Sequence, residues 1–264
     1  MELNLNNKTA LVTGGSKGIG LAIATALAKE GVRVAVGARG TTPELKELMH
    51  EYDVEHFAVD LAEPRGPERL VAAVASSYGS LDLLVNNVGA SEPAATSLDF
   101  SDEQWQRLFE INFFGVVRAV RAAAPLLAAG TDAAVVNIAS LNARLPAGMI
   151  APYSASKAAL VNFSKAVSEE LAPQGIRVNS VSPGPVRTPL WTAPGGFAHL
   201  FAAQLDTTVD DVMDRVLPET MSISAGRVGE PREVADLVAY LASPRAAYIT
   251  GADHLVDGGM HKFA

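Results

Sequence analysis

The alternation of short β-branched runs with longer segments of helical period limits the possible folds of this chain more than any other feature. Seven short apolar runs are typical of buried strands. They are Thr9 to Val12, Arg33 to Ala38, Glu55 to Asp60, Leu83 to Asn86, Ala133 to Ala139, Arg177 to Ser182 and His254 to Val256. Strands separated by helices form parallel sheets that are covered on both faces. We therefore predict an α/β fold with a doubly wound, seven-stranded, mainly parallel sheet and helices on both faces.

Helix start signals lie between these runs. The candidate helices begin near Gly18, Pro43, Arg65, Ser101, Pro152 and Pro231. Ser101 and Gln104 have the spacing of a capping box. Neither a flexible linker nor an internal repeat divides the chain, so we expect one domain, residues 1–264, to bind the cofactor and carry out catalysis. The segment 190–222 interrupts the alternation and is interpreted as a substrate lid, with a mobile surface insertion as the alternative.

Composition excludes several classes of function. A net charge of −8 opposes nucleic-acid binding, and the absence of cysteine excludes thiolate catalysis. We see no targeting segment and no segment near the roughly 18 apolar residues that span a bilayer, so we expect a cytoplasmic protein with no membrane partner. The five histidines lack metal-ligand spacing, and no G-x-S-x-G motif is present, so neither a metal site nor a serine-hydrolase site is predicted.

A glycine loop connects the first predicted strand to the first predicted helix. The sequence there is TGGSKGIG, residues 13–20. Glycines at such a turn let a pyrophosphate approach the backbone, and the amides and dipole of the helix N-terminus favour an anion. A tight turn that merely needs glycine for its backbone geometry is the alternative interpretation.

Further motifs follow along the chain in a fixed order. Asn86-Asn87-Val88-Gly89 ends the fourth strand, YSASK covers residues 153–157, and Pro183-Gly184 precedes Thr188. Together with the glycine loop, this series resembles the short-chain dehydrogenase/reductase family, with TGxxxGxG and YxxxK motifs, and is similar to its 3-oxoacyl-[acyl-carrier-protein] reductases. Val88 departs from the alanine that is usual there. The resemblance implies a Rossmann fold, a nicotinamide cofactor and a homodimer or homotetramer.

The resemblance also assigns the site residues. It implies a catalytic set of Asn112, Ser140, Tyr153 and Lys157, in which the asparagine holds a water for proton relay. The implied cofactor site contains Gly14, Ser16, Lys17, Gly18, Ile19, Gly20, Arg39, Asp60, Leu61, Asn87, Val88, Gly89, Tyr153, Lys157, Pro183, Gly184, Val186 and Thr188. Asp60 resembles the residue that meets the adenine, although a carboxylate that caps the following turn is an alternative.

Elementary chemistry supports the catalytic assignment. A free tyrosine has a pKa of about 10, and a nearby cation favours its phenolate. Tyr153 and Lys157 are four residues apart, so on a helix they share one face. Ser140 follows the fifth strand, at the sheet edge where ligands bind, and its hydroxyl can orient a substrate carbonyl. Each residue alone has a structural alternative, as a packing, solvated or capping residue.

The end of the second strand indicates which dinucleotide is preferred. An NAD site would place a carboxylate there, but the sequence has Ala38 and Arg39. Arg39 and Lys17 suit a 2′-phosphate, so we predict that NADP(H) is preferred over NAD(H), with solvated surface cations as the alternative.

The predicted activity is the reversible, NADP(H)-dependent reduction of a small-molecule ketone or aldehyde to an alcohol. The alternatives are an NAD(P)-dependent alcohol dehydrogenase working oxidatively and a non-catalytic NADP(H) sensor. A mostly apolar or aromatic substrate is the hypothesis, and packing of the lid itself is the alternative. The candidate substrate residues are Asn142, Arg144, Leu145, Met149, Trp191, Phe197 and Phe201.

Overall fold

The computed structural model describes residues 2–262 and contains a seven-stranded sheet. The strands are β1 (Thr9–Thr13), β2 (Arg33–Ala38), β3 (Val54–Ala58), β4 (Leu83–Asn86), β5 (Ala134–Ile138), β6 (Arg177–Pro183) and β7 (Asp253–Val256). Their order is β3-β2-β1-β4-β5-β6-β7, and every neighbouring pair is parallel. The predicted doubly wound sheet is therefore confirmed, and it is parallel throughout.

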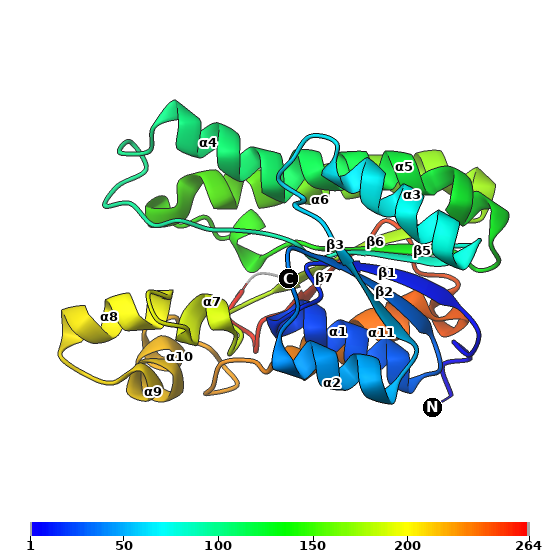
Figure 1. The fold of residues 1–264 in the computed structure, drawn as a ribbon. Helices are drawn as coiled ribbons and strands as arrows, with labels where there is room; N and C mark the ends of the chain where they lie inside the picture. Colours follow the sequence, from blue (N-terminus) through cyan, green and yellow to red (C-terminus); the bar gives the residue numbers. More distant parts are fainter. Residues whose placement is uncertain (1, 263–264) are drawn as a thin grey trace.

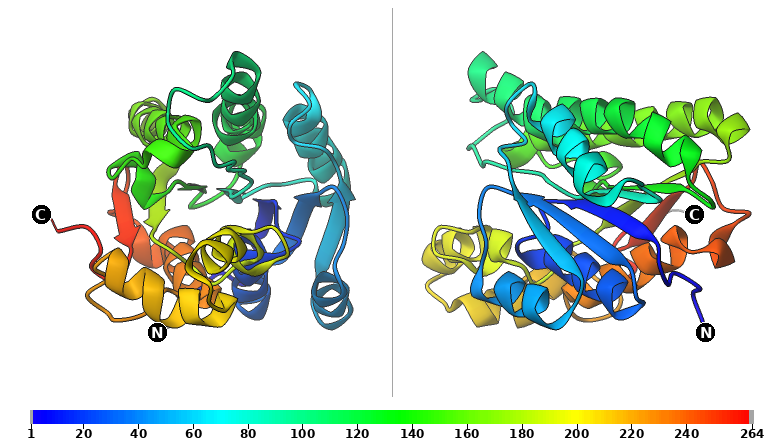
Figure 2. Two further views of the ribbon diagram at one scale, coloured as in Figure 1. Left: turned by 90° about the vertical axis from the view of Figure 1, so that its left-hand side faces the viewer. Right: turned by 45° about the vertical axis from the view of Figure 1, so that its right-hand side comes forward.

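Helices cover both faces of the sheet (Figure 1). One face carries α1 (Gly18–Lys29), α2 (Pro43–Glu51) and α11 (Pro231–Ala242); the other carries α3 (Gly66–Tyr78), α5 (Gly115–Ala129) and α6 (Ala151–Leu171). The views in Figure 2 show the same three layers. Two separate apolar cores result, because the strand side chains point alternately to the two faces: Leu11 and Leu84 pack on one side, Val12 and Val85 on the other.

The strand order reverses between β1 and β4. Chain segments leave these two neighbouring strands in opposite directions, which opens a crevice at their carboxyl ends. Buried polar side chains mark that edge: the Asn86 amide donates to Asn137 Oδ1 at 2.9 Å, and Asn137 donates to Ser164 Oγ at 2.8 Å. The loops that follow β1, β4, β5 and β6 therefore meet at one end of the sheet.

The segment 190–222 is largely helical rather than an open loop. It lies within α7 (Pro189–Thr192), α8 (Phe197–Leu205), α9 (Val209–Asp211), a π-helical turn (Val212–Val216) and α10 (Leu217–Thr220). Ala198, Val212, Met213 and Leu217 form a small core of their own. These helices project beyond the carboxyl end of the sheet (Figure 1).

A long helix corrects one expectation from the sequence. The helix α4 (Asp102–Phe109) continues through a π-helical turn (Glu110–Phe114) into α5, and the resulting helix Asp102–Ala129 has 28 residues and a hydropathy of 1.4 in its most apolar window. Length and composition alone would allow this helix to cross a membrane, contrary to the expectation that no segment comes near that length. Val116, Ala119 and Ala123 are buried in the core between α5 and the sheet, a packing that also requires an apolar helix.

Candidate active site

A cavity of about 760 Å³ opens at the carboxyl end of the sheet. All 18 residues of the predicted cofactor set line it, from Gly14 in the glycine loop to Thr188 before α7. Ser140, Tyr153 and Lys157 line the same cavity, as do Asn142, Met149, Trp191, Phe197 and Phe201 from the predicted substrate set. The structure thus brings the glycine loop, the Tyr-Lys helix and the segment 190–222 to one place.

The glycine loop leaves space and amides for an anion. Gly14 and Gly18 have φ values of +66° and +57°, which L side chains rarely adopt. A Cβ at Gly20 would lie 2.4 Å from both Asn87 Nδ2 and the Gly14 carbonyl oxygen. No side chain caps the N-terminus of α1, and its first turn contains no acidic residue. These features fit a pyrophosphate bound to the first amides of the helix.

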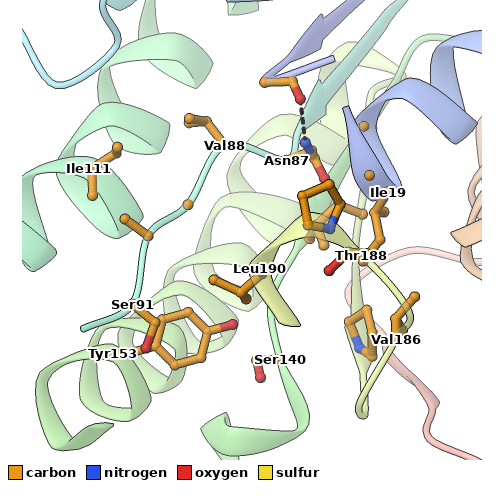
Figure 3. A pocket seen from close by; sticks show the side chains of 18 of the residues that line it. Ile19, Asn87, Val88, Ser91, Ile111, Ser140, Tyr153, Val186, Thr188 and Leu190 are labelled. Atoms are coloured by element: carbon orange, nitrogen blue, oxygen red, sulfur yellow. Dashed lines mark hydrogen bonds between the residues drawn. The ribbon is translucent and has the colours of Figure 1, made fainter. Parts of the chain in front are cut away.

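Neighbouring side chains hold the loop in this conformation. Asn87 donates from its amide to the carbonyl oxygens of Thr13 and Gly14 at 3.0 and 3.1 Å. The Thr13 hydroxyl accepts from the backbone amides of Asn87 and Val88, and the Thr42 hydroxyl donates to the Ser16 carbonyl at 2.9 Å. Asn87 therefore positions the loop through its side chain, at the meeting point of β1 and β4 (Figure 3).

The two cations of the predicted phosphate site are both exposed at the glycine-loop end of the cavity. Across residues 2–262, the ion pairs of the protein involve neither Lys17 nor Arg39. Both side chains are therefore free to bind an anion beside Thr42. Asp60, by contrast, accepts from the Ala62 amide at 2.9 Å, which matches the capping alternative, although Asp60 also lines the cavity.

Tyr153 extends from the first turn of α6 into the cavity, with its phenol directed toward Ser140 (Figure 3). Burial raises the pKa of the Tyr153 phenol, and the hydrogen bond with Ser140 lowers it by a smaller amount. Ser140 follows β5 directly, and its hydroxyl oxygen also accepts from the Asn142 amide at 3.1 Å. Burial thus keeps the phenol protonated more firmly than in water.

Lys157 lies one turn further along α6, as the four-residue spacing predicts. Its side chain is only 3% exposed, and Nζ donates to the Ile138 carbonyl at 2.7 Å and lies 5.8 Å from the centre of the Tyr153 ring. Burial lowers the pKa of Lys157 from 10.5 to about 8. The lysine is thus near the phenol, but desolvation is the main cause of the shift in the Tyr153 pKa.

Asn112 lies behind the cavity rather than on its wall. The side chain is fully buried, its Oδ1 accepts from the Ala90 amide and its Nδ2 donates to the Ala90 carbonyl, both at 2.9 Å. Both polar atoms therefore join the π-helical turn Glu110–Phe114 to the segment after β4.

Two residues of the predicted substrate set lie outside the cavity. Arg144 donates to Asp253 Oδ2 from Nε at 3.1 Å and from Nη2 at 2.9 Å. Leu145 completes a tight turn through its amide, and its carbonyl oxygen accepts from Asn142. Neither Arg144, which pairs with Asp253 of β7, nor Leu145 lines the cavity.

Other cavity residues were missed by sequence reasoning. They include Ser91, Glu92, Arg107, Leu108, Ile111, Ile150, Leu190, Met221 and Met260. Three of them could have been predicted from their position in the sequence. Ser91 and Glu92 closely follow the fourth strand, and Leu190 begins the lid segment. Arg107 and Ile111 lie on one helix at four-residue spacing, but nothing in the sequence shows that this face meets the cavity.

A doubly wound parallel sheet whose glycine turn and Tyr-Lys helix open into one cavity is the arrangement of a dinucleotide-dependent oxidoreductase. The family model described as enoyl-(acyl carrier protein) reductase matches residues 14–261. The chain belongs to the short-chain dehydrogenase/reductase family. It is 33% identical to the 3-oxoacyl-[acyl-carrier-protein] reductase of Staphylococcus epidermidis, over 97% of this chain and 99% of that protein.

Solved structures agree with this assignment. L-sorbose reductase from Gluconobacter frateurii, complexed with NADPH and L-sorbose, superposes with a TM-score of 0.92 at 34% identity and full coverage of both chains. A variant of actinorhodin polyketide ketoreductase with NADPH superposes with a TM-score of 0.88 at 38% identity, over 98% of this chain and 99% of that one. These relatives are carbonyl reductases.

Proposed function

We propose that this protein is an NADP(H)-dependent reductase that converts a ketone or aldehyde into an alcohol, reversibly, with Tyr153 as the proton donor. The observation that supports this most directly is the meeting of Ser140, Tyr153 and Lys157 with the glycine loop in one cavity. We further propose that it acts in the cytoplasm, as a dimer or tetramer, on a small molecule.

The reaction adds a hydride and a proton to a carbonyl. The nicotinamide, when bound, supplies the hydride to the carbonyl carbon. The Tyr153 hydroxyl gives its proton to the oxygen as negative charge develops there, and Ser140 donates a hydrogen bond to the same oxygen. Burial raises the pKa of Tyr153, so the phenol holds the proton that reduction requires near neutral pH. Lys157 adds positive charge beside the phenol and stabilises the phenolate formed on transfer.

The preference for NADP(H) rests on Lys17 and Arg39. Both line the glycine-loop end of the cavity, and the residues directly after β2, Arg39 and Gly40, include no carboxylate to bind a ribose hydroxyl. Two free cations there favour the extra phosphate of NADP(H). Two structural neighbours, L-sorbose reductase and the actinorhodin polyketide ketoreductase variant, were solved with NADPH.

Parallel turnover assays test the proposal. Oxidation of NADPH and of NADH would be followed by absorbance against a panel of ketones, aldehydes and oxoacyl thioesters. We expect consumption of NADPH with at least one carbonyl, at a kcat/KM at least tenfold above that with NADH. Equal or better efficiency with NADH would contradict the cofactor assignment.

Tyr153→Phe tests the chemistry separately. The variant loses only the hydroxyl, so we expect kcat to fall by at least 100-fold while NADPH binding and the melting temperature stay close to those of the parent. Tyr52→Phe removes a phenol outside the cavity and is the matched control. Retention of near-parental turnover in Tyr153→Phe would overturn the proposed mechanism.

A further inference from the structure

The arginines around the substrate half of the cavity all face carboxylates. Arg107, on the cavity wall, binds Glu92 through two bonds, Nε to Oε1 at 3.0 Å and Nη2 to Oε2 at 2.7 Å. Arg144 pairs with Asp253, and Arg187 contacts Asp210, Asp214 and Glu230. Arg215 and Arg227 pair with Asp211 and Glu233. The net charge that these groups present to a ligand is therefore close to zero or negative.

Two exposed cations on the cavity wall, Lys17 and Arg39, lie at the other end of the cavity. Arg39 follows β2 and Ser140 follows β5, and β1 and β4 lie between these strands. Three strand spacings separate the two residues by roughly 14 Å. Lys17 and Arg39 are therefore available to the cofactor but remote from a group attached to the reacting carbonyl.

The remaining wall of the substrate half is apolar and aromatic. Trp191 lies 5.5 Å from Phe197 and 6.4 Å from Phe201, measured between ring centres, and all three line the cavity with Met149, Ile150 and Leu190. Such a wall gains free energy by covering an apolar ring or chain, and it offers nothing to a charged one.

We propose that the substrate is a free, uncharged carbonyl compound with an apolar ring system, and not an acyl thioester held by a coenzyme A or carrier-protein arm. That arm ends in a phosphodiester on a carrier protein and in a diphosphate in coenzyme A, and the arginine on the wall of the substrate half, Arg107, is already compensated by Glu92. This inference rests on the proposed reductase function and narrows its substrate class.

Matched substrates separate the two possibilities. With NADPH present, kcat/KM would be measured for 2-tetralone, for acetoacetyl-N-acetylcysteamine, and for the acetoacetyl thioesters of coenzyme A and of an acyl carrier protein. The three thioesters share the reacting group and differ in phosphate and protein. We expect kcat/KM for 2-tetralone to be at least tenfold higher than for any of the three thioesters. We also expect kcat/KM for the coenzyme A and carrier-protein thioesters to be no higher than for the N-acetylcysteamine thioester. A tenfold advantage of either phosphate-bearing thioester would overturn the proposal. Absence of NADPH consumption with every carbonyl tested would instead contradict the proposed reductase itself.

Glu92→Gln tests the role of charge compensation. The substitution leaves Arg107 as a cation without its carboxylate partner. We therefore compare kcat/KM for the coenzyme A thioester with kcat/KM for the N-acetylcysteamine thioester. We expect the ratio of the first to the second to rise about threefold at low salt and to return to the parental value at 0.5 M salt. Glu169→Gln breaks a similar exposed ion pair, with Lys165 at 3.0 Å, away from the cavity, and should leave the ratio unchanged. An unchanged ratio in Glu92→Gln would refute the electrostatic argument.

Discussion

Lys157, the lysine proposed to assist catalysis, is a residue at which the proposed function and stability conflict. Lys157 is buried on α6 with a single hydrogen-bond acceptor, the Ile138 carbonyl, and burial lowers its pKa to about 8. The unfolded chain holds the same proton up to a pH near 10.5. The folded state therefore carries an unfavourable contribution below pH 8, and this contribution fades as the pH rises from 8 to 10.5.

Lys157→Met should reveal this contribution. Methionine fills a similar volume without a charge, so at pH 7 we expect the free energy of unfolding to increase by about 1–2 kcal/mol after the loss of one hydrogen bond is subtracted. The gain should shrink between pH 8 and 10, and turnover should fall at least 100-fold. Urea unfolding of both proteins across this pH range measures the effect. A variant less stable than its parent at pH 7 would show that the buried amine is stabilising.

Residues at strand ends could be assigned to the cavity from the sequence, whereas residues whose position depends on distant hydrogen-bond partners could not. The cofactor residues follow from motifs at strand ends, and the sheet necessarily brings strand ends together. Asn112 and Arg144 also carry the right chemistry, but their hydrogen bonds go to Ala90 and Asp253. Those partners are 22 and 109 residues away, and no local pattern indicates them.

Among the elements, the segment 190–222 differs most from its predicted form. Sequence reasoning expected a loop-like lid, but the segment is helical and has its own small core. Arg187, between β6 and α7, forms ion pairs with Asp210 and Asp214 on the segment. It also forms an ion pair with Glu230, which precedes α11, and so connects the segment to the rest of the domain. The strands and the helix starts were predicted from the sequence, whereas this ionic connection was not.

Arg187→Met should loosen the lid segment. Because the three contacts are partly exposed, we expect a moderate effect: KM for the carbonyl substrate rises about threefold to tenfold, kcat changes less, and hydrogen exchange in 197–217 becomes faster. Arg215→Met removes an arginine whose partners, Asp211 and Glu219, lie on the same segment, and it is the control. Equal effects of the two variants would argue against a connection specific to Arg187.

At the scale of the whole molecule, a few large apolar side chains are exposed. Phe114 is 43% exposed at the start of α5 and packs against Phe113, while Leu98 is 93% exposed and Tyr248 fully exposed. The family resemblance implies association through the long helices that contain Asn112 and Tyr153, and Phe114 lies on the first of these.

Phe114→Glu should weaken that association. A charge on this helix face would oppose burial between subunits, so we expect the parent to sediment as a dimer or tetramer and the variant to shift toward monomer at micromolar concentration. Leu205→Glu places the same charge at a 55%-exposed position on the lid segment and should not change the mass. Sedimentation of the parent as a monomer would contradict the expected assembly.

The strand reversal between β1 and β4 also has a consequence for how such an enzyme can be diversified. The groups proposed to choose the dinucleotide, Lys17 and Arg39, are encoded before β4, and the groups proposed to meet the substrate are encoded after it. The two choices are therefore separable along the gene as well as across the cavity. A single recombination near the codon for Asn86, between two genes of this family, would transfer the residues proposed to choose the coenzyme together. The residues proposed to contact the substrate would stay as they are in the parent.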